Sequence, residues 1–414
     1  MKFHQHRLDN GLQIIGEVNP SARSMALGFF VRTGARDETA DVSGVTHFLE
    51  HMVFKGTPRR SALDVNRDFD RIGAHYNAFT SEENTVFYAA ILPEYLSQAV
   101  DILADILRPS LRSDDFEMEK KVIIEEIGMY EDQPMWSAYD HAKRLFFGQH
   151  PLGNSILGTP ESISALTPEQ MRAYFERRYV APNITVAAAG NFDWQQLVEE
   201  VGRRCSAWQS GPSGREVAGQ TNGTNGFEVR SKDNVFQEHV VLMSPAPAAE
   251  SPLRFAADTL ALVLGDDSGS RLYWQLVDPG YADSADTSFH DHQGAGYFCT
   301  MFSNEPARTA ANLDIVYAVL KTVQRDNITA EELQQAKSKI LSRVVRGNER
   351  PMGRMRSIGR DWTYLGEYHT VDEELAAFDA VSLDDIRSVL DRYPLDQVTT
   401  LALGPLKEIN RTTA

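Results

Sequence analysis

The stretch SGVTHFLEHMVFKGT, residues 43–57, places two histidines and a glutamate close together, in the order His47, Glu50, His51. The apolar residues around them predict a helix over most of this stretch. Residues four apart lie on one face of a helix, one turn from each other, so both imidazoles can reach a single ion. Glu50 then lies on the flank of the same face.

Two imidazoles and a carboxylate in this arrangement are typical of a metal site. Neutral imidazole is a good zinc ligand, and a catalytic zinc takes three protein ligands and keeps one position for water. The ion makes that water more acidic, and a nearby carboxylate can take its proton and pass it to a leaving amine. The sequence therefore predicts His47 and His51 as metal ligands and Glu50 as the general base.

The alternative is a helix with two ordinary histidines, which is the commoner situation for such a pair. The expected helix, from Val45 to Phe54 with Ser43 as a candidate cap, is otherwise apolar. Two imidazoles and a carboxylate in an apolar helix are costly unless they are paired or bind a metal. The surrounding residues therefore favour the metal.

A third ligand has to come from another element, and the acidic helix expected over SDDFEMEKKVIIEEIGMYED, residues 113–132, offers candidates. Glu119 and Glu126 are seven residues apart, so they share one face of that helix. Solvated surface is the commoner place for a helical glutamate. The pattern by itself does not choose between Glu125 and Glu126.

The segment QSGPSGREVAGQTNGTNG, residues 209–226, has no apolar periodicity and divides the chain almost evenly. Its Gly, Ser, Thr and Asn content is typical of a linker. A helix–turn–helix outline recurs on either side, and aligning Phe116 with Leu333 matches the apolar positions of the two copies. Strand-like runs alternate with helical segments in both halves. We predict an α+β fold of two similar halves, each a mostly antiparallel sheet covered by helices, with a metal-bearing domain 1–208 and a metal-free domain 227–414.

The amino-acid composition argues against some classes of binding partner. The chain has 414 residues, and 41 Lys and Arg against 58 Asp and Glu give a net charge of −17, which argues against nucleic acid and anionic membranes. The sequence contains no run of about 18 apolar residues, so it predicts no membrane span. We expect no signal peptide at the start. The two cysteines, Cys205 and Cys299, cannot form a disulfide framework. A cytoplasmic protein is the simplest expectation.

The motif HFLEH resembles the inverted zinc motif of the pitrilysin and insulin-degrading enzyme family, the inverzincin signature. In that family the third ligand lies on a helix about 75 residues beyond the second histidine, and Glu126 lies 75 residues beyond His51. A supporting acid precedes that ligand by seven residues, which is the position of Glu119. The resemblance implies that Glu126, and not Glu125, completes a site for one Zn²⁺ per chain. The N/O ligand set is also compatible with manganese or cobalt.

A second segment, RIGAHYNAFTSEENTVFYAAIL, residues 71–92, resembles the family's edge strand, which receives the substrate backbone. The resemblance implies that Gly73, Asn77, Ala78 and Thr80 bind substrate. An exposed strand edge pairs with an extended peptide through main-chain hydrogen bonds, which agrees with that role.

The second half departs from the family at one point. Family members carry there an arginine and a tyrosine, seven residues apart, that bind the substrate carbonyl where negative charge develops. Val277 stands at the arginine position, and Tyr281 is the candidate for the tyrosine. Arg271 and Tyr273, nearby, are expected to be structural. The resemblance therefore implies a homodimer, or a heterodimer with a related chain that supplies the Arg/Tyr pair.

We expect no metal site in the second half. At the offset of the repeat, Arg343 falls opposite Glu126. His290 and His292 can share one face of a strand, but no third ligand has a suitable spacing.

The resemblance implies a zinc metalloendopeptidase that cleaves short or unstructured peptides within a chamber formed by two chains. Water made acidic by the metal would attack the peptide bond, with Glu50 as the general base. The alternative is a zinc-binding but non-catalytic peptide-binding or structural subunit, which needs a partner chain carrying the Arg/Tyr pair. Replacing Glu50 with Gln separates the two hypotheses, because only an enzyme loses cleavage while keeping zinc.

Overall fold

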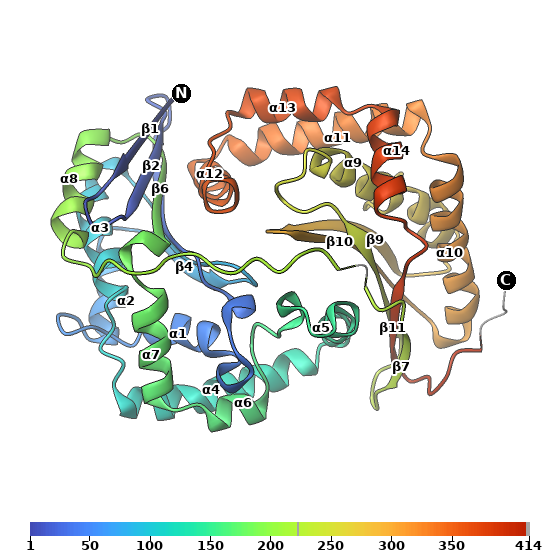
Figure 1. Cartoon of the computed structure of the whole chain (residues 1–414), viewed down its shortest axis with the longest axis horizontal. Helices are drawn as coiled ribbons and strands as arrows, with labels where there is room; N and C mark the ends of the chain where they lie inside the picture. The colour runs from blue at the N-terminus through green and yellow to red at the C-terminus, as the bar shows by residue number, and fades with distance from the viewer. Residues whose placement is uncertain (222, 411–414) are drawn as a thin grey trace. The chain divides into compact units, whose positions relative to one another are not determined.

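A computed structural model describes residues 1–221 and 223–410 and divides them into two compact units (Figure 1). Unit 1 comprises Met1–Gly128, Asn154–Glu216 and Val345–His369. Unit 2 comprises Met129–Gly153, Val217–Val344 and the residues from Thr370 onward. Each unit contains one sheet with helices packed against it.

The sheet of unit 1 has six strands in the order β1-β2-β6-β3-β5-β4. Only β2 and β6 run parallel, and the other neighbours are antiparallel. The strands are β1 Lys2–Arg7, β2 Gln13–Val18, β3 Met25–Val31, β4 His75–Thr80, β5 Thr85–Ile91 and β6 Ile184–Gly190. All seven residues of β3 (MALGFFV) are buried, as a continuous apolar run in a sheet covered on both faces requires. Along β4, at the edge, exposed and half-buried residues alternate.

Eight helices of the described residues lie mainly in unit 1. They are α1 Val45–Val53, α2 Ala62–Arg71, α3 Leu96–Ile106, α4 Ser113–Glu131, α6 Pro160–Ala165, α7 Pro168–Arg178, α8 Trp194–Cys205 and α12 Pro351–Leu365. Helix α12 packs against β6 and β3, where Met355 and Ile358 join a cluster with Ala26, Phe30 and Ala187.

The sheet of unit 2 has five strands in the order β7-β11-β8-β10-β9, with β7 and β11 parallel and the rest antiparallel. The strands are β7 Phe227–Ser231, β8 Glu238–Ala246, β9 Ser284–His292, β10 Ala295–Asn304 and β11 Thr399–Gly404. The helices are α5 Pro134–Phe147, α9 Arg254–Leu264, α10 Thr309–Asp326, α11 Ala330–Asn348, α13 Val371–Ala380 and α14 Leu383–Arg392. A π-helical segment, η6, spans Tyr273–Val277.

The two sheets share one topology. Omitting β1, the order β2-β6-β3-β5-β4 of unit 1 corresponds strand by strand to β7-β11-β8-β10-β9, with one parallel pair at the same place. This confirms the predicted α+β fold of two similar halves, each with a mostly antiparallel sheet covered by helices.

The two halves of the chain exchange a helix. Helix α5, from the first half, packs on β8 and β11 of unit 2, and α12, from the second half, packs on the sheet of unit 1. Pro134 and Pro351 begin these helices, at the same offset that aligns Phe116 with Leu333. The compact units therefore do not follow the contiguous boundaries 1–208 and 227–414.

The expected linker, 209–226, contains no helix or strand in its described residues. The side chain of its Arg215 is nevertheless buried in unit 1, with ion pairs to Asp37 at 2.9 Å and Glu83 at 3.0 Å. These ion pairs therefore hold the first part of the segment against unit 1.

No helix of the described residues is long and apolar enough to cross a membrane. Cys205 and Cys299 are both buried free thiols.

Candidate metal centre

Helix α1 is held at its N-terminus by a carboxylate from outside the helix. The Glu38 oxygens accept hydrogen bonds from the backbone N–H groups of Gly44, at 2.7 Å, and Thr46, at 2.8 Å. Gly44 has φ +88°, and a Cβ there would lie 2.6 Å from the carbonyl oxygen of Leu157, so only glycine fits. The prediction that Ser43 caps this helix is wrong, because Gly44 occupies the N-cap position. The cap makes no side-chain hydrogen bond to the helix.

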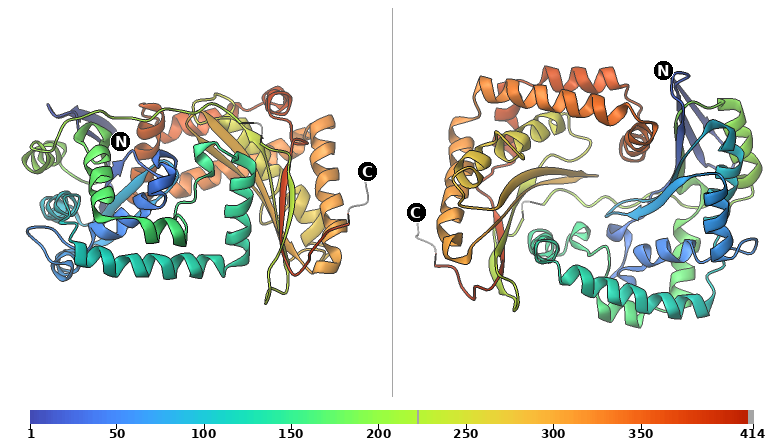
Figure 2. Two further views of the ribbon diagram at one scale, coloured as in Figure 1. Left: turned by 60° about the horizontal axis from the view of Figure 1, so that its bottom comes forward. Right: turned by 180° about the vertical axis from the view of Figure 1, so that it is seen from behind.

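Helix α4 brings a carboxylate to the two histidines of α1, and both views of Figure 2 show α1 (blue) beside α4 (teal). One ligand atom from each of His47, His51 and Glu126 lies within 4.8 Å of the other two. Glu126 is half-buried, whereas Glu125 is exposed. The fold therefore brings Glu126, and not Glu125, to the two histidines.

A second carboxylate on α4 fixes the orientation of His51. Glu119 Oε1 lies 2.9 Å from Nδ1 of the imidazole, and Glu119 Oε2 pairs with Lys55 Nζ at 2.5 Å. Nε2 of His51 is thus left facing Glu126, at 3.5 Å from Oε2. A histidine whose far nitrogen is held by a carboxylate is the usual arrangement around a protein-bound metal.

Burial and neighbouring charges shift the pKa values of the two histidines in opposite directions. Burial, and then the neighbouring His51, lowers the pKa of His47 to about 3, so its imidazole is neutral and has a lone pair to donate. Burial alone would lower the pKa of His51, but the hydrogen bond to Glu119 and the charges of Glu126 and Glu50 raise it. Burial raises the pKa of Glu119, yet its bonds to His51 and Lys55 outweigh this and keep it anionic.

The predicted base, Glu50, is bound by the end of strand β4. Thr80 Oγ1 donates a hydrogen bond of 2.6 Å to Glu50 Oε2. Burial raises the pKa of Glu50, against the lowering effects of Thr80 and His51. A carboxylate with a raised pKa accepts a proton more readily, as a general base requires.

Strand β4 forms one edge of its sheet and packs against α1. Gly73, just before the strand, has φ +60°, and Asn77 is exposed with its Oδ1 accepting the N–H of Ala78 at 2.8 Å. A free strand edge next to the candidate metal centre is available for main-chain pairing. Substrate binding by these residues stays a prediction.

The residues fit a zinc ion. Two imidazoles and one carboxylate are a catalytic zinc donor set, and the buried Nδ1 of His47 has no hydrogen-bond partner among the described residues. Within residues 1–221 and 223–410, no other group of three His, Cys, Asp or Glu side chains gathers in this way. His290 and His292 accordingly form no such group.

The corresponding place in unit 2 is filled by ion pairs. Arg343, opposite Glu126 in the repeat, pairs with Asp266 at 2.6 Å, and Lys339 pairs with the same carboxylate at 2.8 Å. Basic side chains therefore occupy the helix face that carries the candidate ligand Glu126 in unit 1.

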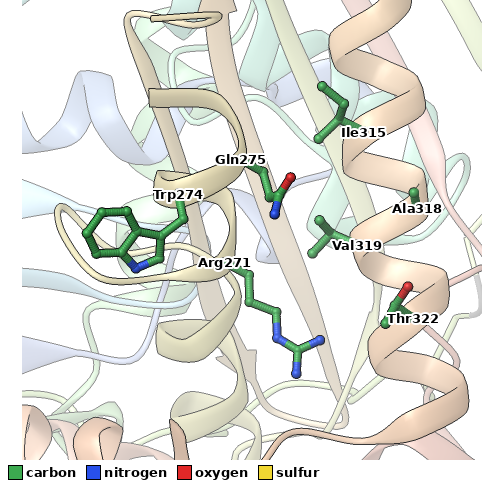
Figure 3. A pocket seen from close by; sticks show the side chains of 7 residues that line it. All are labelled: Arg271, Trp274, Gln275, Ile315, Ala318, Val319 and Thr322. Atoms are coloured by element: carbon green, nitrogen blue, oxygen red, sulfur yellow. The ribbon is translucent and has the colours of Figure 1, made fainter. Parts of the chain in front are cut away.

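The residues considered for carbonyl binding also lie in unit 2. Arg271 is bound to Glu332 at 2.7 and 2.9 Å, which agrees with the expected structural role. It borders a pocket of about 490 Å³ between η6 and α10, which Trp274 and Val319 also line (Figure 3). Tyr281 is partly exposed, and the Arg308 guanidinium lies 3.8 Å from its ring centre. Its role as a carbonyl donor stays a prediction.

Three contacts of the centre were not foreseen from the sequence. Lys55 follows His51 by four residues, so helical spacing could have indicated it. Glu38 had no local signal, because a loop carries it to the helix end. Thr80 was predicted to contact substrate, whereas here its hydroxyl binds Glu50.

A His-x-x-Glu-His helix beside a helix with a carboxylate, on an α+β fold of two similar halves, defines the inverzincin class of metallopeptidase. Residues 13–160 match the family model described as insulinase, peptidase family M16, and residues 165–340 match the model described as peptidase M16 inactive domain. The chain belongs to this peptidase family.

Relatives and solved structures agree with this membership. An uncharacterised zinc protease of Mycobacterium leprae is 32% identical over 96% of this chain and 91% of its own. An uncharacterised zinc protease of Streptomyces coelicolor is 33% identical over 97% of this chain and 89% of its own. The crystal structure of a protease from Helicobacter pylori shares the fold, with a TM-score of 0.90 at 23% identity, over 98% of this chain and 99% of that one.

Proposed function

We propose that this chain is a zinc-dependent endopeptidase that holds one zinc ion through His47, His51 and Glu126. The observation that supports this most directly is the convergence of these three ligand atoms within 4.8 Å of one another. A bound zinc supplies Lewis-acid polarisation of a peptide carbonyl and lowers the pKa of water.

The chain's own residues then have distinct tasks. Glu50 takes the proton of the attacking water and returns it to the leaving amine. Thr80 holds one oxygen of that carboxylate in place. Glu119, supported by Lys55, fixes the ring of His51.

Substrate binding is assigned to the edge of β4. An extended peptide can add to this edge by main-chain hydrogen bonds, whatever its sequence. Short or unstructured peptides are therefore the proposed substrates, because a folded protein cannot present an extended segment of this kind. The residues proposed to bind the substrate at this edge are Gly73, Asn77, Ala78 and Thr80.

A second chain completes the proposed enzyme. Val277 lies where the family has its carbonyl-binding arginine, and an aliphatic side chain cannot donate a hydrogen bond. A heterodimer with a related chain that carries the Arg/Tyr pair would supply the missing donors, whereas a homodimer around a chamber would have to act without the arginine.

The test compares the purified chain with its Glu50→Gln variant on a mixed set of quenched peptides, with zinc measured in both. Loss of cleavage at unchanged zinc content supports the proposal. A Glu126→Gln variant should also lose zinc, with Glu125→Gln, on the exposed side of the same helix, as the matched control. Equal cleavage by wild type and Glu50→Gln would refute the assigned base.

The alternative function rests on Val277. If the chain alone binds zinc and peptides without cleaving them, it is a non-catalytic subunit by itself. Mixing it with a related chain that carries the Arg/Tyr pair then decides between half of an enzyme and a peptide-binding protein.

A further inference from the structure

A small polar pocket of about 170 Å³ lies in unit 1, and it contains none of the metal-centre residues. Strands β1, β2, β6 and β3, residues 213–214 of the linker and the last turn of α12 form its walls. Its volume is below the roughly 300–1,000 Å³ of pockets that hold drug-sized ligands. The ligand it could take is therefore small.

One row of residues across four strands forms the floor. Arg7 pairs with Gln13, Gln13 with Thr185, and Thr185 with Phe30 in the strand register. Residues paired in this way lie on the same face of a sheet, so their side chains point to one side. Arg32, two residues beyond Phe30, lines the same pocket. The row offers two guanidinium groups, an amide and a hydroxyl.

The lining is cationic in an otherwise acidic chain. It includes Arg7 and Arg32 and no Asp or Glu, although the chain has 58 acidic and 41 basic residues. Arg7 has no hydrogen-bond or ion-pair partner for its side chain among the described residues. Burial, and then the charge of Arg215, lowers the pKa of Arg32, against the raising effects of Asp37 and Glu83.

The acids that act on Arg32 are already shared with other arginines. Glu83 pairs with Arg36 at 2.6 Å and with Arg215 at 3.0 Å. Asp37 pairs with Arg215 at 2.9 Å and with Arg178 at 3.1 Å. Asp37 and Glu83 thus act on four guanidinium groups, those of Arg32, Arg36, Arg178 and Arg215.

The linker backbone closes one side of the pocket. The N–H of Gly214 donates to Asn183 Oδ1 at 3.2 Å, and Arg178 donates to the Gly214 carbonyl at 2.9 Å. A Cβ on Gly214 would lie 3.8 Å from Nη1 of Arg32. A ligand between the arginines would therefore tie the linker to the sheet.

We propose that this pocket binds a small free oxyanion of the phosphate class, held by Arg7 and Arg32 with Gln13 and Thr185 as further donors. Guanidinium groups match the geometry of phosphate oxygens. The proposal is independent of the peptidase function.

Isothermal titration with inorganic phosphate tests it, on the zinc-loaded chain at constant ionic strength set with sodium chloride. We expect saturable one-site binding that Arg7→Gln weakens about tenfold to a hundredfold, the usual effect of losing one bond to a charged group. Arg23→Gln, an exposed arginine of the same unit outside the pocket, should bind phosphate as the wild type does. General salt effects act equally on both variants.

Thr185→Val serves as the second variant, since it removes a donor without changing the charge, and it should weaken phosphate severalfold. Adenosine monophosphate should bind no more tightly than phosphate, because the pocket has no room for a nucleoside. Absence of saturable binding, or equal affinity in Arg7→Gln and Arg23→Gln, would overturn the proposal. Tighter binding of the nucleotide would overturn the assignment to a free anion.

Discussion

The hydroxyl of Thr80 is the nearest support of the proposed base, and its removal should act on the chemical step. In Thr80→Val the 2.6 Å hydrogen bond to Glu50 is lost while the shape of the side chain is kept. A hydrogen bond to a charged group contributes about 1.5–3 kcal/mol, so kcat should fall about tenfold to a hundredfold. KM should change little, because the main-chain edge of β4 remains.

Steady-state kinetics on a quenched peptide would measure this, with Thr80→Ser as the conservative control that restores kcat. A rise in KM at constant kcat would instead indicate that Thr80 acts by binding substrate, as the family resemblance implied.

Single residues were predictable to different degrees. His47, Glu50 and His51 share one helix, so their spacing alone indicates a common site. Glu126 could be chosen over Glu125 only from a family spacing, since both lie on a helix whose rotation the sequence does not fix. The structure makes the choice through exposure, and it adds Lys55, whose charge matters only once Glu119 is beside it.

At the scale of the element, α1 depends on a cap that comes from elsewhere. In Glu38→Ala two buried N–H groups, of Gly44 and Thr46, lose their acceptor. Each such loss costs about 1–3 kcal/mol, so the free energy of unfolding should fall by about 2–6 kcal/mol. Urea unfolding of the zinc-free chain would measure it.

Glu38→Gln keeps one acceptor oxygen and should lose about half as much stability. A Glu38→Ala chain as stable as the wild type would show that water can replace this cap.

Strand β8 begins with a buried acid that should make stability depend on pH. The Glu238 side chain is fully buried, and burial raises its pKa from 4.5 to about 7, against the N–H of Leu406 that it accepts at 3.2 Å. Between these two pH values the native state keeps a proton that the unfolded state has released. The free energy of unfolding therefore falls as pH rises from about 4.5 to about 7, and the loss is complete above that range.

Glu238→Gln does not titrate, so it should be more stable than the wild type at pH 8 by on the order of 2 kcal/mol. The difference should vanish near pH 4.5. Urea unfolding at several pH values would show this, and parallel pH curves for the two chains would contradict it.

Buried strands leave a clear pattern in the sequence, whereas the edge position of β4 was predicted only through the family resemblance. The apolar runs of β3, β5 and β6 give a clear strand signal, because a strand buried on both faces is apolar along its length. The sequence pattern of β4 resembles any surface strand, and its place at the sheet edge follows from pairing across the chain. Local sequence holds no information on such a neighbour.

At the scale of the whole molecule, the exchange of α5 and α12 was not predicted. An amphipathic helix shows that one face is buried, but it does not identify the sheet that covers that face. The segment 209–226 is rich in Gly and Ser, and this composition, which is typical of a linker, suggested a domain boundary there. The Arg215 side chain, buried against Asp37 and Glu83, shows that the first part of this segment, up to Glu216, belongs to unit 1.

The exchanged helix α12 is anchored by a buried ion pair, which offers a test of how much the exchange stabilises unit 1. Arg354 donates to Glu17 at 2.8 Å across 337 residues of sequence, and both side chains are almost fully buried. In Arg354→Ala the Glu17 charge keeps only the Tyr368 hydroxyl, at 2.6 Å. An uncompensated buried charge costs about 3–5 kcal/mol, so the free energy of unfolding should fall by about 3 kcal/mol.

Arg356→Ala is the comparison variant, at an exposed residue of the same helix whose guanidinium donates to the Tyr88 hydroxyl at 2.8 Å, and it should cost about 1 kcal/mol. The double variant Glu17→Gln/Arg354→Met removes both charges and should recover much of the loss, because the penalty comes from the unpaired carboxylate. If Arg354→Ala is no less stable than Arg356→Ala, the pair does not hold α12 on the sheet. The apolar contacts of Met355 and Ile358 would then hold α12 on the sheet without help from the ion pair.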